Sequence, residues 1–363
     1  MHHCRMRYRE AHRATVLLTA LVLGAGAAGC SAARVDKAGG SAAAKAEPLA
    51  LTLAAHDRDY AYGTFAKAVA GLSNGSMRVK IATNWRDVPG RAGIDYERGI
   101  VADVRSGRVP LGIIGARVWD TLGVRSFQAL VAPFLIESLD LEGRAIKTEF
   151  AARALATLSR QGVVGIALLP GPLRRPFGVR RALVGPNDYK GGTIGIRPGG
   201  VAETTFDALG GVPRGYAPAD VSGLDGAELD LLVIAADAFD RRSRPLTGNV
   251  VFWPKPQTII MNRAAFERLT PRERSVLRRA GREAIGPELR RDADDERYER
   301  SLLCNVHTVR IARASPSARR ALQAKVRPVY RLLNESTLTK AWIAQIKRMR
   351  EHYATGIDTV RCP

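Results

Sequence analysis

Apolar runs with a period of two alternate with helical segments from residue 51 onward, and this order limits the fold more than any other feature. The run LTLAAH at 51–56 alternates as a strand does, and MRVKIAT at 77–83 alternates again. Between them lies a segment with apolar residues at helical spacing, which stops at Asn74-Gly75. A strand, a helix and a second strand in this order predict a βαβ unit.

The same pattern continues to residue 170. Residues 95–107 have a helical period, and VPLGIIGA at 109–116 is typical of an apolar strand. Residues 138–162 have the period of one long amphipathic helix, and 163–170 form an apolar run of the buried-strand type. Strands joined by helical crossovers predict an α/β fold with parallel sheets covered by helices on both faces.

The last part of the chain, from Thr270 to Tyr353, is predicted to be almost entirely helical. Thr270, Pro271 and Glu273 form a capping-box signal with proline at the first helical position. The chain that follows residue 49 is longer than one compact core usually holds, so two lobes are expected.

The first 29 residues have the pattern of an export leader. A basic segment precedes an apolar, small-residue run that is too short for a comfortable membrane span. The run ends at Ala27-Ala28-Gly29-Cys30, which resembles a bacterial lipobox in which Cys30 becomes the lipidated first residue. Plain cleavage nearby is the alternative and would give a free exported protein. Residues 30–49 are small and polar, as in a flexible tether.

The charge balance favours an anionic partner. Lys and Arg number 56 against 35 Asp and Glu, which gives a formal charge of +21. Export and the lack of nucleic-acid-binding motifs argue against DNA or RNA. Residues 171–198 carry five arginines, of which Arg180 and Arg181 are expected on a solvated surface.

The cysteines predict one disulfide. Cys4 leaves with the leader and Cys30 is the lipidation candidate, so Cys304 and Cys362 remain as a pair in an oxidising compartment. Only His307 lies close to Cys304 in sequence, so neither a metal nor another cofactor is expected.

No catalytic residue is predicted. Residues 71–75 match G-x-S-x-G, but a nucleophile elbow needs a strand before the serine and a helix after it. Here the order is reversed, so Ser73 is expected at a helix C-terminus. His56, His307 and His352 lack metal-ligand spacing. An envelope hydrolase is therefore the weaker alternative.

Six segments between about residues 50 and 290 resemble, in order, the solute-binding proteins of tripartite ATP-independent periplasmic (TRAP) transporters, of the dicarboxylate-binding type. They are the first strand and helix, the run from residue 105 through Pro133-Phe134-Leu135, PNDYKGGTIGIRP at 186–198, LGGVP at 209–213, LDGAE at 224–228 and LTGNVVFWPKPQTIIMNRAAF from 246. Together these segments identify the resemblance, although each is weak alone.

The resemblance implies a two-lobed fold with mixed sheets, an interlobe cleft and long C-terminal helices. It places lobe I at 50–173 and 250–290, and lobe II with spanning helices at 174–249 and 291–363. It also implies a monomer that binds a small organic acid and delivers it to a TRAP-type permease, without a cofactor. A sensory or scaffold lipoprotein with the same fold is the alternative.

The resemblance also implies the ligand-binding residues. Arg197 stands where the family has the arginine that grips the ligand carboxylate, and a second family arginine corresponds to Arg175, with Arg174 as the adjacent competitor. Guanidinium suits this role because its paired donors match both carboxylate oxygens and its charge persists at every relevant pH.

Three further residues are candidates for the cleft. Arg117 ends a predicted strand, and Tyr216 and Trp253 are aromatics that either wall the pocket or pack in the core. Leu229 follows Glu228 where many family members carry a polar residue that touches the ligand. That third polar contact therefore has no counterpart in this chain.

Overall fold

The protein was described from a computed structural model, which covers residues 47–56, 61–85, 94–216, 221, 223–236, 244–305 and 309–362. The predicted leader and tether, Cys30 and His307 lie outside these residues. Residues 46–363 form one compact unit. Within the described ranges, no helix has both the length and the apolar character needed to cross a membrane.

The first sheet has the strand order β2-β1-β3-β11-β4. Its strands are β1 (Leu49–Ala54), β2 (Met77–Ala82), β3 (Leu111–Gly115), β4 (Val163–Leu169) and β11 (Gln257–Asn262). Strand β1 is parallel to β2 and β3, and α1 (Ala61–Leu72) and α2 (Ile94–Arg105) are the predicted crossovers. Strand β11, from much later in the chain, is antiparallel to both β3 and β4, so the sheet is mixed rather than purely parallel.

The long helix predicted at 138–162 is wrong in one respect, because it is broken. Helix α3 (Leu139–Ile146) is followed by α4 (Glu149–Thr157) and a 3-10 turn, η3 (Leu158–Gln161). Thr148 between them has an extended backbone, with φ −78° and ψ 164°. Its hydroxyl donates to the carbonyl of Ala145 at 2.8 Å, a local bond with which threonine competes against helix continuation.

The second sheet has the order β12-β9-β5-β8-β6-β7, and β10 pairs with β5. Its strands are β5 (Leu173–Gly178), β6 (Thr193–Ile196), β7 (Val212–Gly215), β8 (Gly226–Leu229), β9 (Pro245–Thr247), β10 (Trp253–Pro254) and β12 (Arg310–Ala312). Strand β6 is parallel to β7 and β8, whereas β5 is antiparallel to β8, β9 and β10. Helices α5 (Gly200–Ala208) and α6 (Leu231–Ala236) follow β6 and β8.

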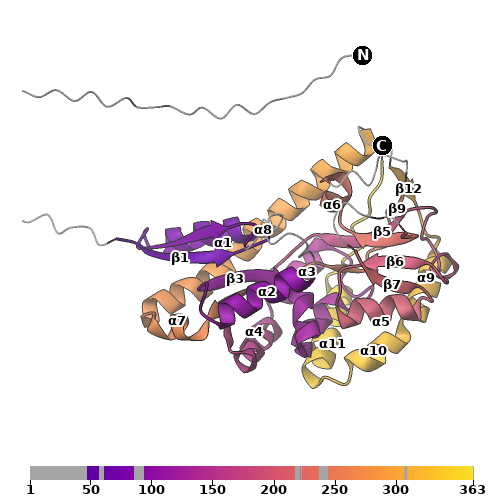
Figure 1. Cartoon of the computed structure of the whole chain (residues 1–363). Coiled ribbons are helices and arrows are strands. Elements are labelled where there is room, and N and C mark those ends of the chain that lie inside the picture. Colours follow the sequence, from indigo (N-terminus) through magenta and orange to yellow (C-terminus); the bar gives the residue numbers. More distant parts are fainter. Residues whose placement is uncertain are drawn as a thin grey trace, which may run out of the picture. The chain divides into compact units, whose positions relative to one another are not determined.

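Helix α8 (Pro271–Asn305) links the two halves. The predicted capping box is present, since the Thr270 hydroxyl accepts from the Glu273 N–H at 3.2 Å and the Glu273 carboxylate accepts from the Thr270 N–H at 2.7 Å. The helix packs on α1, β4 and α3 of the first half and on α6 of the second. Figure 1 shows it running beside α1 toward α6.

The remaining helices are α7 (Arg263–Arg268), α9 (Pro316–Lys325), α10 (Arg327–Leu333) and α11 (Thr337–His352). Two 3-10 helices, η1 (Ala116–Leu122) and η2 (Arg125–Val131), follow β3, and a shorter one, η4 (Pro186–Asp188), precedes β6. Helix α11 packs against η2, α3 and α4. The expected α/β class with two lobes, mixed sheets and long C-terminal helices is confirmed.

Besides the connection through α8, the chain passes between the sheets at two neighbouring places. One crossing joins β4 to β5 and the other joins β10 to β11, and the N–H of Lys255 in the second donates to the carbonyl of Pro172 in the first at 3.0 Å. The largest apolar cluster surrounds the first sheet and continues to β6, α5 and the C-terminal helices, and a smaller one lies beside the second sheet. The two crossings therefore mark the boundary where a cleft between the halves is expected.

Candidate functional site

Two cavities meet at this boundary and share Arg197 and Lys255. The larger has a volume of about 60 Å³ and is lined by the crossings, the start of α6 and one face of α8. The smaller, of about 20 Å³, is lined by residues that include Arg117, Arg174 and Trp253. More spacious hollows lie elsewhere, so it is the convergence of charged side chains rather than volume that singles out this place.

Arg197 lies directly after β6 and has an uncommitted side chain. Its backbone N–H donates to the carboxylate of Glu228 at 2.7 Å. Its guanidinium has no hydrogen bond or ion pair with any residue in the described part of the chain, and its Nε is buried without a hydrogen-bond partner. The guanidinium carbon lies 5.4 Å from the ring centroid of Tyr216, at cation–π range. A permanently charged group with free donors therefore borders both cavities.

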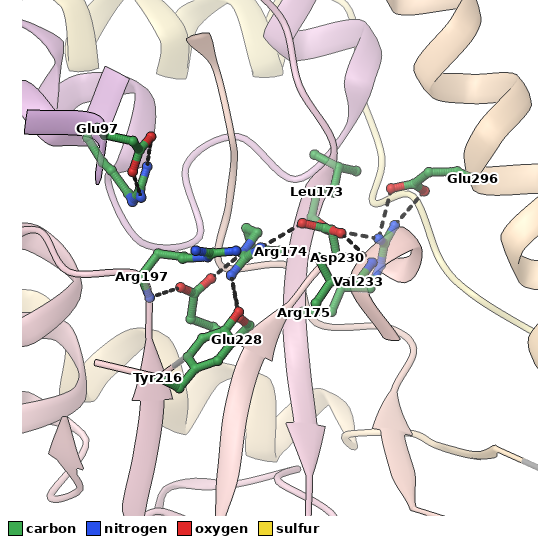
Figure 2. A network of polar contacts seen from close by, with 11 residues as sticks. Glu97, Leu173, Arg174, Arg175, Arg197, Tyr216, Glu228, Asp230, Val233 and Glu296 are labelled. Atoms are coloured by element: carbon green, nitrogen blue, oxygen red, sulfur yellow. Dashed lines mark hydrogen bonds and ion pairs between the residues drawn. The ribbon is translucent and has the colours of Figure 1, made fainter. Parts of the chain in front are cut away.

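Arg174 is fully engaged by protein groups. Its side chain is 2% exposed and forms ion pairs with Glu228 and, at 2.6 Å, with Asp230. It also donates to the Tyr216 hydroxyl at 3.1 Å and to the Glu228 carbonyl at 2.6 Å (Figure 2). Burial would raise the pKa of Asp230, but the charges of Arg174 and Lys255 outweigh it and leave that pKa lowered. Asp230 therefore stays ionised and neutralises Arg174.

Arg175 lies on the other side of β5. It donates to both carboxylate oxygens of Glu296, at 2.9 and 2.8 Å, and to the carbonyl of Leu173 (Figure 2). It also donates to the carbonyl of Asp358 at 3.1 Å. Successive side chains of a strand point to opposite faces, so only one of two adjacent arginines can face Arg197. The structure brings Arg174, and not Arg175, beside Arg197.

Arg117 is also paired. It forms an ion pair with Glu97, whose carboxylate additionally accepts the N–H of Gly115 at 2.9 Å. Burial would raise the pKa of Glu97, yet Arg117 lowers it below the ordinary value. An added Cβ on Gly115 would lie 2.2 Å from Arg117, so glycine is needed for this approach. Arg117 thus borders the smaller cavity as one half of a neutral pair.

The two aromatic candidates are both near the site and buried. Tyr216 is 7% exposed and contacts both Arg174 and Arg197. Trp253 lines the smaller cavity, lies opposite Arg174 in the β10–β5 pair, and packs on Phe252 with ring centroids 5.3 Å apart. Trp253 therefore both lines the site and packs in the core, whereas Tyr216 contacts two arginines of the site without lining either cavity.

Four other residues singled out in the sequence, Cys304, Cys362, Ser73 and Leu229, lie outside both cavities. Cys304 and Cys362 form a disulfide with a Cα–Cα distance of 5.4 Å. The Ser73 hydroxyl accepts from the Met77 N–H at 3.0 Å and is within 3.2 Å of two carbonyls, so it is engaged at the end of α1. Leu229 is buried in β8. Among the described residues, no group of three or more His, Cys, Asp or Glu side chains is arranged to hold a metal ion.

The acidic side of the site was not predicted from the sequence. Asp230 and a stripe of carboxylates on α8 line the larger cavity; the stripe comprises Glu288, Asp292, Asp295 and Glu299. The spacing of these four, at i, i+4, i+7 and i+11, places them on one helix face and was a usable signal. Lys255, which lies in the crossing after β10, had no such signal.

Two lobes, paired crossings and an unpaired arginine at a strand end facing the cleft define a solute-binding protein of the two-lobed periplasmic class. The model of a family described as bacterial extracellular solute-binding protein, family 7 (DctP), matches residues 58–336. The chain belongs to this family, and the resemblance drawn from the sequence is confirmed.

Solved structures share the fold. A TRAP periplasmic solute-binding protein from Ochrobactrum anthropi is 18% identical with a TM-score of 0.71, covering 84% of this chain and 97% of that one. The sugar acid binding protein DctPAm from Advenella mimigardefordensis, in complex with galactonate, is 19% identical with a TM-score of 0.71, covering 83% and 99%. A protein from Shewanella oneidensis with bound succinate is 18% identical with a TM-score of 0.70, covering 83% and 99%. A search of curated protein sequences finds no match.

Proposed function

We propose that the protein captures a small organic acid in the cleft and delivers it to a TRAP-type membrane permease, without catalysis. The observation that carries this proposal is the guanidinium of Arg197, which borders both cavities and has no hydrogen-bond or ion-pair partner among the described residues. A solute carboxylate would supply the two acceptors that this group lacks.

The energetics suit such a contact. A charge-assisted hydrogen bond contributes roughly 1.5–3 kcal/mol, so a bidentate pair would supply about half of the roughly 8 kcal/mol that micromolar binding needs. The acids bound by the proteins from Advenella mimigardefordensis and Shewanella oneidensis support the same solute class. Burial in the cleft would provide the rest.

The other arginines have supporting roles in this proposal. Arg174, rather than Arg175, is the second arginine of the site, and it holds Tyr216 and Glu228 in place around Arg197. Arg117 contributes to the wall together with Glu97. Arg175 stabilises the contact between β5, α8 and the C-terminal segment.

The proposal includes a monomer that is exported and lipid-anchored through Cys30 on the outer face of the cytoplasmic membrane. The small residues before Cys30 support this part. Replacing Cys30 by serine is expected to release the protein from the membrane fraction. Retention of a Cys30→Ser variant would overturn the anchor but not the solute site.

The solute site is tested by calorimetry on the purified mature protein with a panel of organic acids. Arg197→Ala is expected to weaken binding of any acid found by at least about tenfold. Arg180→Ala is the matched control, because Arg180 is 73% exposed and lies outside both cavities. Binding that survives Arg197→Ala unchanged, or no binding by any acid, would refute the proposal.

A further inference from the structure

One face of α8 lines the larger cavity with carboxylates. Glu288, Asp292, Asp295 and Glu299 all border the same cavity as Arg197. Helical spacing makes them one continuous stripe. The cavity therefore has a cationic group at the end of β6 and an acidic wall on α8.

The positively charged side chains that line the cavity do not neutralise all the carboxylates of this acidic wall. Arg291 contacts three of the four carboxylates: Glu288 in a short ion pair, Asp292 at 3.5 Å and Asp295 at 3.7 Å. The positive charge of Lys255 helps to lower the pKa of Asp230. Two other acidic groups near the cavity are already matched, since Asp230 pairs with Arg174 and Glu296 with Arg175.

Glu299 is left without a counter-charge. It is 8% exposed, yet it forms neither a hydrogen bond nor an ion pair within the described part of the chain. Asp292, 4% exposed, likewise has one carboxylate oxygen without a partner. Burial, with the nearby charge of Asp295, raises the pKa of Glu299 to about 7. Buried carboxylates in this state gain most from a cation that enters the cavity.

We infer that the solute is an amino acid whose amine lies apart from its carboxylate, with the carboxylate on Arg197 and the ammonium against Glu299 and Asp292 of α8. This inference rests on the proposed function. An ammonium group brings positive charge and three donors to oxygens that lack both. A second carboxylate on the solute would instead meet four carboxylates of the stripe, so simple dicarboxylates are disfavoured. Hydroxyl groups would supply donors but no charge.

The test compares three matched series by calorimetry on the mature protein. The amino acids are β-alanine, γ-aminobutyrate, δ-aminovalerate and ε-aminocaproate, each beside the hydroxy acid and the dicarboxylate of the same chain length. The best amino acid is expected to bind at least about tenfold more tightly than its dicarboxylate and its hydroxy acid. Equal or tighter binding of the dicarboxylates or hydroxy acids at every length would overturn the inference.

Variants separate the inference from the proposed function. Glu299→Gln is expected to weaken amino-acid binding at least about tenfold while leaving dicarboxylates unchanged or slightly tighter. Glu283→Gln is the control, because Glu283 also lies on α8 but is 49% exposed and outside the cavity. If acids bind in an Arg197-dependent manner without preference for the amine, only the inference fails. If no acid binds at all, the proposed function fails with it.

Discussion

The carboxylate of Glu228 accepts a hydrogen bond from the backbone N–H of Arg197 at 2.7 Å. Its other oxygen holds the guanidinium of Arg174, so one buried carboxylate fixes both the end of β6 and the neighbouring arginine. Because Arg174 is engaged by this contact and by Asp230, Arg197 is the one of these two arginines whose guanidinium has donors to offer a solute.

Arg197→Lys is expected to weaken acid binding by about tenfold or more while leaving the melting temperature nearly unchanged. Lysine keeps the charge but presents a point donor instead of two parallel ones. Calorimetry with the best acid from the panel measures the loss, and thermal unfolding of the solute-free variant checks the fold. An affinity equal to that of the wild type would show that bidentate geometry is not used.

Arg174→Met is expected to lower the free energy of unfolding by about 3–5 kcal/mol, because it leaves the buried carboxylate of Glu228 without its ion-pair partner and that of Asp230 with only the charge of Lys255 nearby. Urea denaturation measures the change. A triple variant that also carries Glu228→Gln and Asp230→Asn should recover part of the loss. If Arg174→Met alone is as stable as the wild type, the ion-pair cluster does not stabilise the fold.

The solute-free protein is expected to become less stable as the pH rises from about 5 to about 8. Burial and Glu288 raise the pKa of Asp292 to about 7, and burial and Asp295 raise that of Glu299 to about 7. Between their ordinary values near 4 and about 7, the folded state keeps protons that the unfolded chain has lost. By linkage, stability then falls with rising pH, by up to about 1.4 kcal/mol per pH unit for each of the two groups.

Thermal unfolding across this pH range provides the measurement. The variant Asp292→Asn with Glu299→Gln removes these two titrating groups and is expected to have a shallower slope than the wild type; Glu142, whose pKa burial also raises, keeps part of it. Persistence of the full wild-type slope in this double variant would assign the pH dependence to other groups.

Loss of the Cys304–Cys362 bond is expected to destabilise the protein by about 2–4 kcal/mol, because the bond closes a loop with a sequence separation of 58. It also holds the C-terminal segment whose Asp358 carbonyl accepts from Arg175. The variant Cys304→Ala with Cys362→Ala is compared with the wild type in urea. Equal denaturation midpoints, with the wild-type bond verified by mass spectrometry, would contradict this.

Much of the first lobe could be predicted because its signals are local. The alternation in β1 and β2, the stop at Asn74-Gly75 and the capping box at Thr270 each depend on neighbouring residues. The break at Thr148 was missed because both flanking segments share one amphipathic period. The resemblance implied that residues 250–290 return to the first lobe, but the antiparallel pairing of β11 with β3 and β4 had no local signal, because these partners are far away in sequence.

The sequence by itself determined the order of strands and helices, the family resemblance and the position of Arg197 at a strand end. Only the tertiary structure decided between Arg174 and Arg175, because the face on which a strand residue lies depends on its pairing with β8 and β10. It also decided which arginine keeps free donors and which carboxylate lacks a partner. These properties arise when side chains from distant segments are buried together, since only then is each charge either matched or left unmatched.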